Sequence, residues 1–309
     1  MDHTSSERPR STYTAAGVLA ILLWSTTIAF SRSLSEEVGA IRAGACIYLL
    51  GGVLGCLYEA LVRRRLVGMF RLPAPYLAGC GLLFVVYTVS LYLAIAMSWS
   101  RQQAIEVGII NYLWPGLTLV LAVPILGTKV RAAFGAGVVL ALAGAAIAPL
   151  RCGEYSPDAL VESLRANPLP YGLALVAAVT WALYSNLSRR WGGRGQGGAV
   201  PLFVLATGAA MAGVHLAFPE PAAWTARAAA EVLYMAVLPT LLAYAFWDAA
   251  MRRGNVILVA AISYLTPLLS TAISVAYLGV APGWNLWAGC ALVIAGAGIC
   301  QRSVVKQAV

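Results

Sequence analysis

Two prolines with polar neighbours are the first residues of this sequence whose types and spacing could bind a small molecule. Pro115 ends the run NYLWP that starts at Asn111, and Pro267 ends the run SYLTP that starts at Ser263. A proline inside a helix donates no amide hydrogen to the carbonyl four residues earlier, here that of Asn111 or Ser263. Carbonyls freed in an apolar environment need a partner from the protein, from water or from a ligand. The two runs therefore predict a polar binding site, and a packing kink is the simpler alternative.

Polar side chains accompany both prolines at helical spacing, which places each set on one helix face. The sets are Asn111, Trp114, Thr118 and Ser263, Thr266, Ser270, Ser274. Hydrogen bonding between membrane helices produces the same polar stripes without any ligand. The candidate binding residues from these two regions are Asn111, Trp114, Pro115, Ser263, Thr266 and Pro267.

Aromatic residues form the second candidate set. Trp24 and Trp181 fall in the middle of apolar stretches, whereas membrane proteins usually carry tryptophan at the two interfaces. Rings with a polar tip suit a partly apolar solute that also carries charged groups. Packing in the core explains any single one of these residues equally well. The aromatic candidates are Trp24, Tyr87, Tyr92, Trp181, Tyr184 and Tyr244.

The segments that must position these residues are apolar and about 20 residues long, the length of a helix that crosses a bilayer. Of the 309 residues, 61% are hydrophobic and 11% are charged, and the mean hydropathy is +0.80. A soluble protein carries roughly a quarter charged residues. We therefore expect an all-α polytopic membrane protein of ten transmembrane helices. They are placed at about residues 14–33, 40–62, 74–96, 104–126, 132–149, 169–189, 199–218, 230–251, 255–279 and 284–302.

The Lys and Arg residues predict the orientation of these helices. With ten helices, 15 of the 21 basic residues fall on the side that carries both termini. Basic loop residues favour the cytoplasmic side. We therefore expect cytoplasmic N- and C-termini, and the net charge of +9 needs no nucleic-acid partner to explain it.

An internal repeat predicts two related halves. Residues 111–127 align with residues 263–279 without gaps, and the same offset of 152 aligns Tyr92 with Tyr244 and residues 136–147 with residues 288–299. Each half has five predicted helices, and an odd number inverts the second half relative to the first. The expected divisions are an N-terminal cytoplasmic tail 1–13, a first repeat 14–149, a periplasmic connecting loop 150–168, a second repeat 169–303 and a C-terminal tail 304–309.

Enzyme chemistry finds little support in the sequence. Only two histidines occur, the six cysteines are scattered, and no pattern typical of hydrolases or metal sites is present, so we expect no catalysis, cofactor or metal. Each acid within a predicted helix has an arginine four or five residues away, which predicts paired charges near helix ends and no lone proton carrier. The pairs are Glu59/Arg63, Asp248/Arg252, Glu231/Arg227 and Glu106/Arg101.

The proline-centred fourth and ninth helices and the Gly/Ala-rich fifth and tenth helices resemble the drug/metabolite transporter superfamily. The run Asn111-Tyr112-Leu113-Trp114-Pro115, followed by Gly127, is similar to the bacterial aromatic amino acid exporter group. The resemblance implies a multi-pass protein of the bacterial inner membrane that exports aromatic and other neutral amino acids by alternating access. Amino acids and the lipid bilayer are the expected partners, and we expect the protein to be a monomer. A broad drug or metabolite exporter is the nearest alternative, and a membrane-embedded enzyme or scaffold is the alternative of another class.

Overall fold

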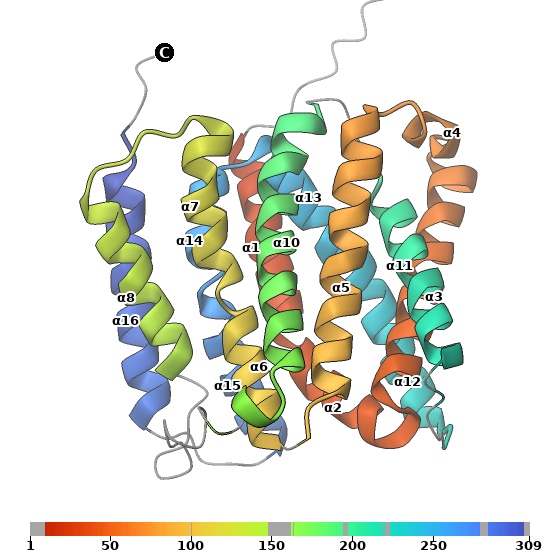
Figure 1. The fold of residues 1–309 in the computed structure, drawn as a ribbon. Coiled ribbons are helices and arrows are strands. Elements are labelled where there is room, and N and C mark those ends of the chain that lie inside the picture. Colours follow the sequence, from red (N-terminus) through yellow and green to blue (C-terminus); the bar gives the residue numbers. More distant parts are fainter. Residues whose placement is uncertain are drawn as a thin grey trace, which may run out of the picture.

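The computed structural model describes residues 10–99, 101–147, 162, 164–193, 197–217, 219, 223–278 and 284–305. These residues form a helical bundle whose only β feature, within the described ranges, is an isolated bridge between Val130 and Val304. The bundle confirms the predicted all-α membrane fold (Figure 1). The predicted loop 150–168 and both predicted tails lie largely outside the described residues.

The first part of the chain forms α1 (Arg10–Ser25), α2 (Thr27–Val38), α3 (Ala40–Leu57), η1 (Tyr58–Val62), α4 (Leu66–Met69), η2 (Pro75–Cys80), α5 (Gly81–Ala96), α6 (Arg101–Asn111), α7 (Trp114–Leu126) and α8 (Ala133–Ile147). The second part forms α10 (Leu169–Trp191), α11 (Val200–Ala217), α12 (Ala226–Met235), η3 (Ala236–Leu242), α13 (Ala243–Arg253), α14 (Val256–Ile262), α15 (Leu265–Leu278) and α16 (Trp284–Ser303).

Four helical stretches in the described residues are long and apolar enough to cross a membrane on their own. They are Ala40–Val62, Pro75–Ala96, Val200–Ala217 and Ala226–Arg253. Their apolar side chains include many that face outward, such as Leu61, Leu82 and Leu216. Exposed apolar side chains at these positions suit contact with lipid, so the bilayer is the solvent for this surface.

Three predicted helices are each interrupted by a turn, and the two prolines predict two of these interruptions. The first is broken at Thr26, the fourth at Tyr112–Leu113, and the ninth at 263–264. The hydroxyl of Thr26 donates to the carbonyl of Leu23 at 2.8 Å, a side-chain bond that competes with the helical one and bends the chain. The other two breaks come two to four residues before Pro115 and Pro267, each of which lies in the first turn of the next helix and donates no amide hydrogen to the carbonyl four residues earlier.

Equivalent helices of the two halves pack against each other in opposite directions. Along α8 and α16, Gly137 lies against Cys300 while Gly144 lies against Leu292, so residue numbers fall along one helix as they rise along the other. The pair α3 and α11 behaves the same way. There, Gly52 meets Leu205 and Gly208 meets residues 48–49. The second half is therefore inverted relative to the first, as predicted.

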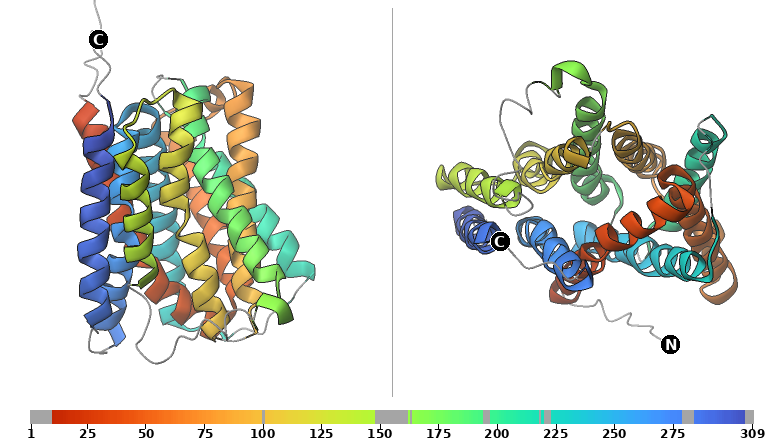
Figure 2. Two further views of the ribbon diagram at one scale, coloured as in Figure 1. Left: turned by 60° about the vertical axis from the view of Figure 1, so that its left-hand side comes forward. Right: turned by 90° about the horizontal axis from the view of Figure 1, so that it is seen from below.

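Glycines allow these antiparallel pairs to approach at backbone distance. A Cβ on Gly144 would lie 2.7 Å from the carbonyl oxygen of Gly289, and one on Gly296 would lie 2.6 Å from that of Gly137. Small residues at helix contacts are the common means of close packing in membranes. The pair α8 and α16 forms one side of the bundle, apart from α3 and α11 (Figure 1, Figure 2).

One end of the bundle collects the start of α1, the ends of α10 and α13, and the end of α16. Arg10 and Arg189 both donate hydrogen bonds to the carbonyl of Gly254, and the bridge between Val130 and Val304 lies at this end too. We call it the terminal end. It is the upper end in Figure 1 and the one that the arginine and lysine distribution predicts to be cytoplasmic.

Candidate solute-binding site

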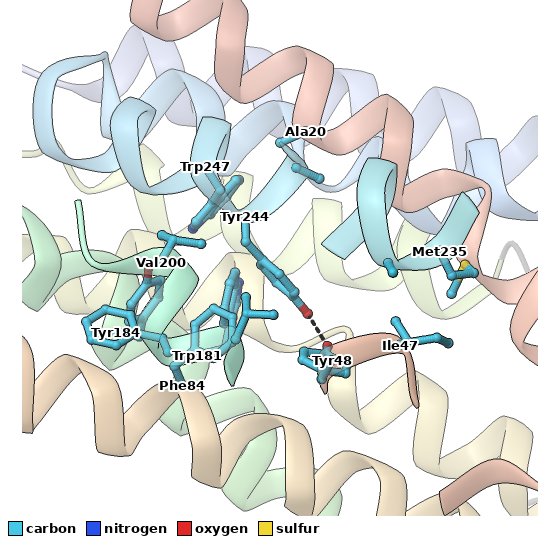
Figure 3. Close-up of a cluster of buried hydrophobic side chains, with 14 of the residues drawn as sticks. Ala20, Ile47, Tyr48, Phe84, Trp181, Tyr184, Val200, Met235, Tyr244 and Trp247 are labelled. Carbon is cyan, nitrogen blue, oxygen red and sulfur yellow. Dashed lines mark hydrogen bonds between the residues drawn. The ribbon is translucent and has the colours of Figure 1, made fainter. Parts of the chain in front are cut away.

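The indole of Trp181, on α10, is the centre of an aromatic cluster drawn from both halves of the chain. Its exposed fraction is 1%, and rings from α1, α5, α7 and α13 surround it. Figure 3 shows Phe84, Tyr244 and Trp247 beside it. Ring centroids lie 5.5 Å away for Trp24 and for Tyr244, 4.6 Å for Tyr87, and 5.0 Å for Tyr184. Offset and edge-to-face contacts of this kind are favourable beyond the area that they bury.

The aromatic candidates thus gather at one place, with Trp114 also against Trp181 at 6.3 Å between centroids. Tyr92 joins the cluster through Tyr48, and the centroids of these two rings lie 6.2 Å apart. Sequence reasoning missed Phe84, Trp247 and Tyr48, which belong to the same cluster. Trp247 could have been found, because it lies three residues after Tyr244 and hence on the same helix face.

Several of these rings lie deep among the helices and still keep part of their surface uncovered. Trp24, Tyr87 and Tyr92 are half-buried although each packs against the core. The indole nitrogen of Trp24 donates to the carbonyl of Pro239 at 3.0 Å, which fixes the ring in place. Preformed, partly uncovered aromatic surface with few polar groups is the usual lining of a small-molecule site.

Buried polar atoms without a hydrogen-bond partner occur where α7 and α15 begin. Among the described residues they include Asn111 Oδ1, Thr266 Oγ1, Ser270 Oγ and the hydroxyl of Tyr264. Leaving such a group unpaired costs about 1–3 kcal/mol. Water or a ligand is therefore needed here to complete the hydrogen bonding.

The polar group and the aromatic cluster adjoin each other. Tyr87 lies beside Asn111, and Tyr112 lies beside Ser270. Trp114 is the first residue of α7, directly after the break, and its indole lies against Trp247 at 5.3 Å between centroids. The broken helices thus bring partnerless polar atoms next to aromatic surface.

The structure around the two prolines differs from the prediction in one respect. Ser263 is fully buried, its hydroxyl donates to the carbonyl of Ala260 at 2.6 Å, and its own carbonyl accepts the amide of Thr266 at 3.0 Å. The expectation that Pro267 frees the carbonyl of Ser263 is therefore wrong, because a tighter turn reuses that carbonyl. Pro267 lies in the first turn of α15, and its side chain is outside the described residues. Pro115 is buried in the first turn of α7.

Three of the four predicted pairs of acid and arginine form near helix ends. The pairs Glu59/Arg63 and Glu231/Arg227 form as predicted, at 3.3 and 2.8 Å. The pair Asp248/Arg252 forms at 2.9 Å in the last two turns of α13, as predicted, but both side chains are only 2% exposed. Two tyrosines from other helices cover the carboxylate of Asp248.

Glu106 is the remaining acid. It is buried, and the hydroxyl of Tyr171, the third residue of α10, donates to it. The side chain of Arg101, its predicted partner, is outside the described residues. Glu106 therefore has Tyr171, from the other half of the chain, as a hydrogen-bond partner, whereas the sequence predicted only an arginine beside it.

The sequence matches the EamA-like transporter family over residues 12–148 and 169–300. The chain belongs to this family. The match covers both of the inverted halves, from which the aromatic cluster draws its residues.

The chain is also similar to three curated proteins, each named aromatic amino acid exporter YddG. That of Escherichia coli (strain K12) is 33% identical over 94% of this chain and 97% of its own length. That of Salmonella typhimurium is 33% identical over 95% and 98%, and that of Ancylobacter novellus is 32% identical over 94% and 97%. A solved crystal structure superposes with a TM-score of 0.80 at 31% identity, covering 95% of this chain and 99% of that one.

Proposed function

We propose that this transporter exports aromatic amino acids, and other neutral ones, from the bacterial cytoplasm by alternating access around the aromatic cluster. The observation that carries the proposal is the position of Trp181, which touches rings from both inverted halves beside partnerless polar atoms at two helix breaks. The names of the three relatives support the choice of substrate.

Both ends of an aromatic amino acid find suitable chemistry in this region. The side chain packs against the half-buried rings of Trp24, Tyr87 and Tyr92, where it gains hydrophobic and ring contacts. The carboxylate meets the amide groups at the start of α7 or α15, since the dipole of a helix favours an anion at its first turn. The ammonium meets oxygen acceptors such as Asn111 Oδ1, Thr266 Oγ1 and Ser270 Oγ, none of which has a well-aligned protein hydrogen bond.

Alternating access follows from the inverted halves. A site shared by two halves that run in opposite directions opens to one face or the other when the halves rock against each other. We propose residues 14–149 and 169–303 as these halves, joined through a periplasmic segment 150–168. The protein then spans the inner membrane several times, with its terminal end facing the cytoplasm. It works as a monomer.

Counterflow in proteoliposomes tests this function. Purified protein is reconstituted with internal tryptophan, phenylalanine or tyrosine, and uptake of a labelled trace of the same amino acid is followed. We expect exchange of aromatic amino acids above that of glutamate, lysine and an unrelated cationic dye. Exchange of the dye equal to that of tryptophan would indicate a broad drug exporter, and no exchange of any amino acid would refute the proposal.

A further inference from the structure

A buried ion pair at the terminal end is not used by the proposed binding site. Arg252 and Asp248 are 2% exposed, and burying two charges costs several kcal/mol per ion unless each is fully hydrogen-bonded. The pair lies within a membrane-spanning stretch, Ala226–Arg253, in contact with the aromatic core.

Arg252 joins α13 to the residues that flank the connection between α10 and α11. Its guanidinium donates to Asp248 and also to the carbonyls of Gly192 at 2.9 Å and Gly197 at 2.6 Å. These backbone acceptors belong to chain segments outside α13. The ion pair therefore ties three segments together at the terminal end.

Asp248 extends these hydrogen bonds toward the aromatic cluster, and we call the whole set around Asp248 and Arg252 the closure. Its Oδ1 accepts the hydroxyl of Tyr76, from η2, at 2.9 Å and that of Tyr184, from α10, at 3.3 Å. The hydroxyl of Tyr76 in turn accepts the amide of Ala199 at 3.2 Å, so η2 is bound to the start of α11 as well. Every one of these bonds must break before the segments can separate.

Gly198 shows how tightly the closure fits. A Cβ at this position would overlap the carboxylate of Asp248 and come within 2.9 Å of the hydroxyl of Tyr76. Gly198 and Gly197 also line a pocket of about 110 Å³ together with Arg65 and Met69. Gly198 therefore borders both that pocket and the carboxylate of Asp248.

The inner face of the closure is part of the aromatic cluster. The ring of Tyr184 stacks on Trp181 at 5.0 Å while its hydroxyl reaches Asp248, and Trp247 is the neighbour of Asp248 in α13. A displacement of Trp181 would therefore reach the carboxylate of Asp248 through the single side chain of Tyr184. A contiguous physical connection of this kind is what coupling between a site and a distant contact requires.

We propose that Asp248 and Arg252 form a latch that holds the solute path closed at the terminal end, and that Tyr184 connects the latch to the aromatic cluster. Asp248 is a positioning residue for transport: it acts through Arg252, Tyr76 and Tyr184, without itself contacting the solute. Transport requires the latch to open in each cycle. The proposal rests on the alternating-access function, but its test below needs no solute.

Cys80 is a natural reporter for this latch. It is fully buried, lies one helical turn after Tyr76 on η2, and sits beside Asp248 and Tyr184. In a variant whose other five cysteines are alanine, a membrane-impermeant maleimide reports whether the terminal end has opened. The label is added separately to each side of reconstituted vesicles of known orientation, and modification is followed by intact mass.

Two variants disrupt the latch in different ways. Asp248→Asn keeps an acceptor for both tyrosines but removes the charge, and Gly198→Ala pushes a methyl group into the carboxylate. Two controls match them. Glu231→Gln removes the other four-residue ion pair of the same span, at the opposite end, and Gly213→Ala adds a methyl group where nothing lies within 4 Å.

We expect Cys80 to react on the order of tenfold faster or more in both latch variants, from the terminal end only, because the closed state loses its differential stabilisation. The two controls should react at the rate of the parent. Cys80 that stays protected in monodisperse latch variants would overturn the proposal, and so would equal acceleration by Gly213→Ala. If counterflow fails while labelling follows the expectation, the substrate assignment is wrong and the latch stands.

Discussion

The hydroxyl of Tyr48, in α3, lies 2.8 Å from the hydroxyl of Tyr244, in α13, so one hydrogen bond joins the two inverted halves beside Trp181 (Figure 3). Both tyrosines are buried, and the ring of Tyr244 also lies against Trp24 at 5.2 Å between centroids. Hydroxyls that pair across the halves position the rings with which a solute would make contact.

This pair predicts non-additive effects of mutation. Tyr48→Phe and Tyr244→Phe each remove one hydroxyl, and each should weaken solute affinity by about 0.5–1.5 kcal/mol, up to roughly tenfold. The double variant should be no weaker than the weaker single one, because either change already breaks the bond. Affinity measured by competition in counterflow checks this, and additive losses would show that the two hydroxyls act separately.

The partnerless hydroxyls predict opposite effects on stability and transport. Thr266→Val and Ser270→Ala remove buried hydroxyls; that of Thr266 has no protein partner, and that of Ser270 has only the hydroxyl of Tyr112 beside it. Both variants should therefore melt at the same temperature as the parent or higher, and yet exchange tryptophan more slowly. Thermal denaturation in detergent and initial counterflow rates, compared in one preparation, decide the matter. A lower melting temperature with unchanged flux would assign these hydroxyls to structure.

The central indole should be essential to the fold as well as to the site. Trp181→Ala empties the middle of the aromatic cluster, and large-to-small changes of aromatic residues cost about 3–5 kcal/mol. We expect a loss of monodisperse protein in size-exclusion chromatography. Trp224→Ala is the matched control, because Trp224 is 52% exposed, and it should leave the elution profile unchanged. Equal yields of the two variants would contradict the packing described.

The orientation of the chain is open to a direct test. Cysteines introduced next to either terminus, in a background without the native ones, should react with an impermeant maleimide only from the cytoplasmic side, as the basic residues of the terminal end predict. A single cysteine in residues 150–168 should react only from the outside. External labelling of either terminus would refute this orientation.

The glycine contacts predict strong position dependence along α8. Gly144→Ala places a methyl group 2.7 Å from the carbonyl oxygen of Gly289, which forces α8 and α16 apart. Gly135→Ala, in the same helix, meets nothing within 4 Å and serves as the control. We expect a lower melting temperature for the first variant only, measured on purified protein. Similar temperatures for both would show that α8 and α16 pack more loosely than these distances indicate.

The sequence predicted the broad fold and much of the aromatic cluster for clear reasons. The membrane class follows from composition, and Trp24 and Trp181 were noticeable because tryptophan in the middle of a membrane helix is unusual. The helix breaks at 112–113 and 263–264 could be expected from the prolines. The break at Thr26 could not, because it depends on a threonine hydroxyl that bonds back to the helix and threonine has many other roles.

The depth of Asp248 could not be predicted either. An arginine four residues away looks the same whether the pair is exposed or buried. The difference comes from Tyr76 and Tyr184, which are far away in sequence and which approach only when η2 and α10 pack against α13. Tyr48 was missed for a similar reason, since a single tyrosine in the apolar helix α3 gives no sign of its partner in the other half.

The antiparallel contacts between equivalent helices have an evolutionary consequence. A protein made of one such half, inserted into the membrane in both orientations, would use these same two contacts, α3 with α11 and α8 with α16, to build a homodimer. Fusion of the two copies into one chain fixes their ratio and lets each diverge. At the offset of 152, Asp248 and Arg252 correspond to Ala96 and Ser100. The ion pair is thus an asymmetry that a dimer of identical copies could not have possessed, and that fusion made possible.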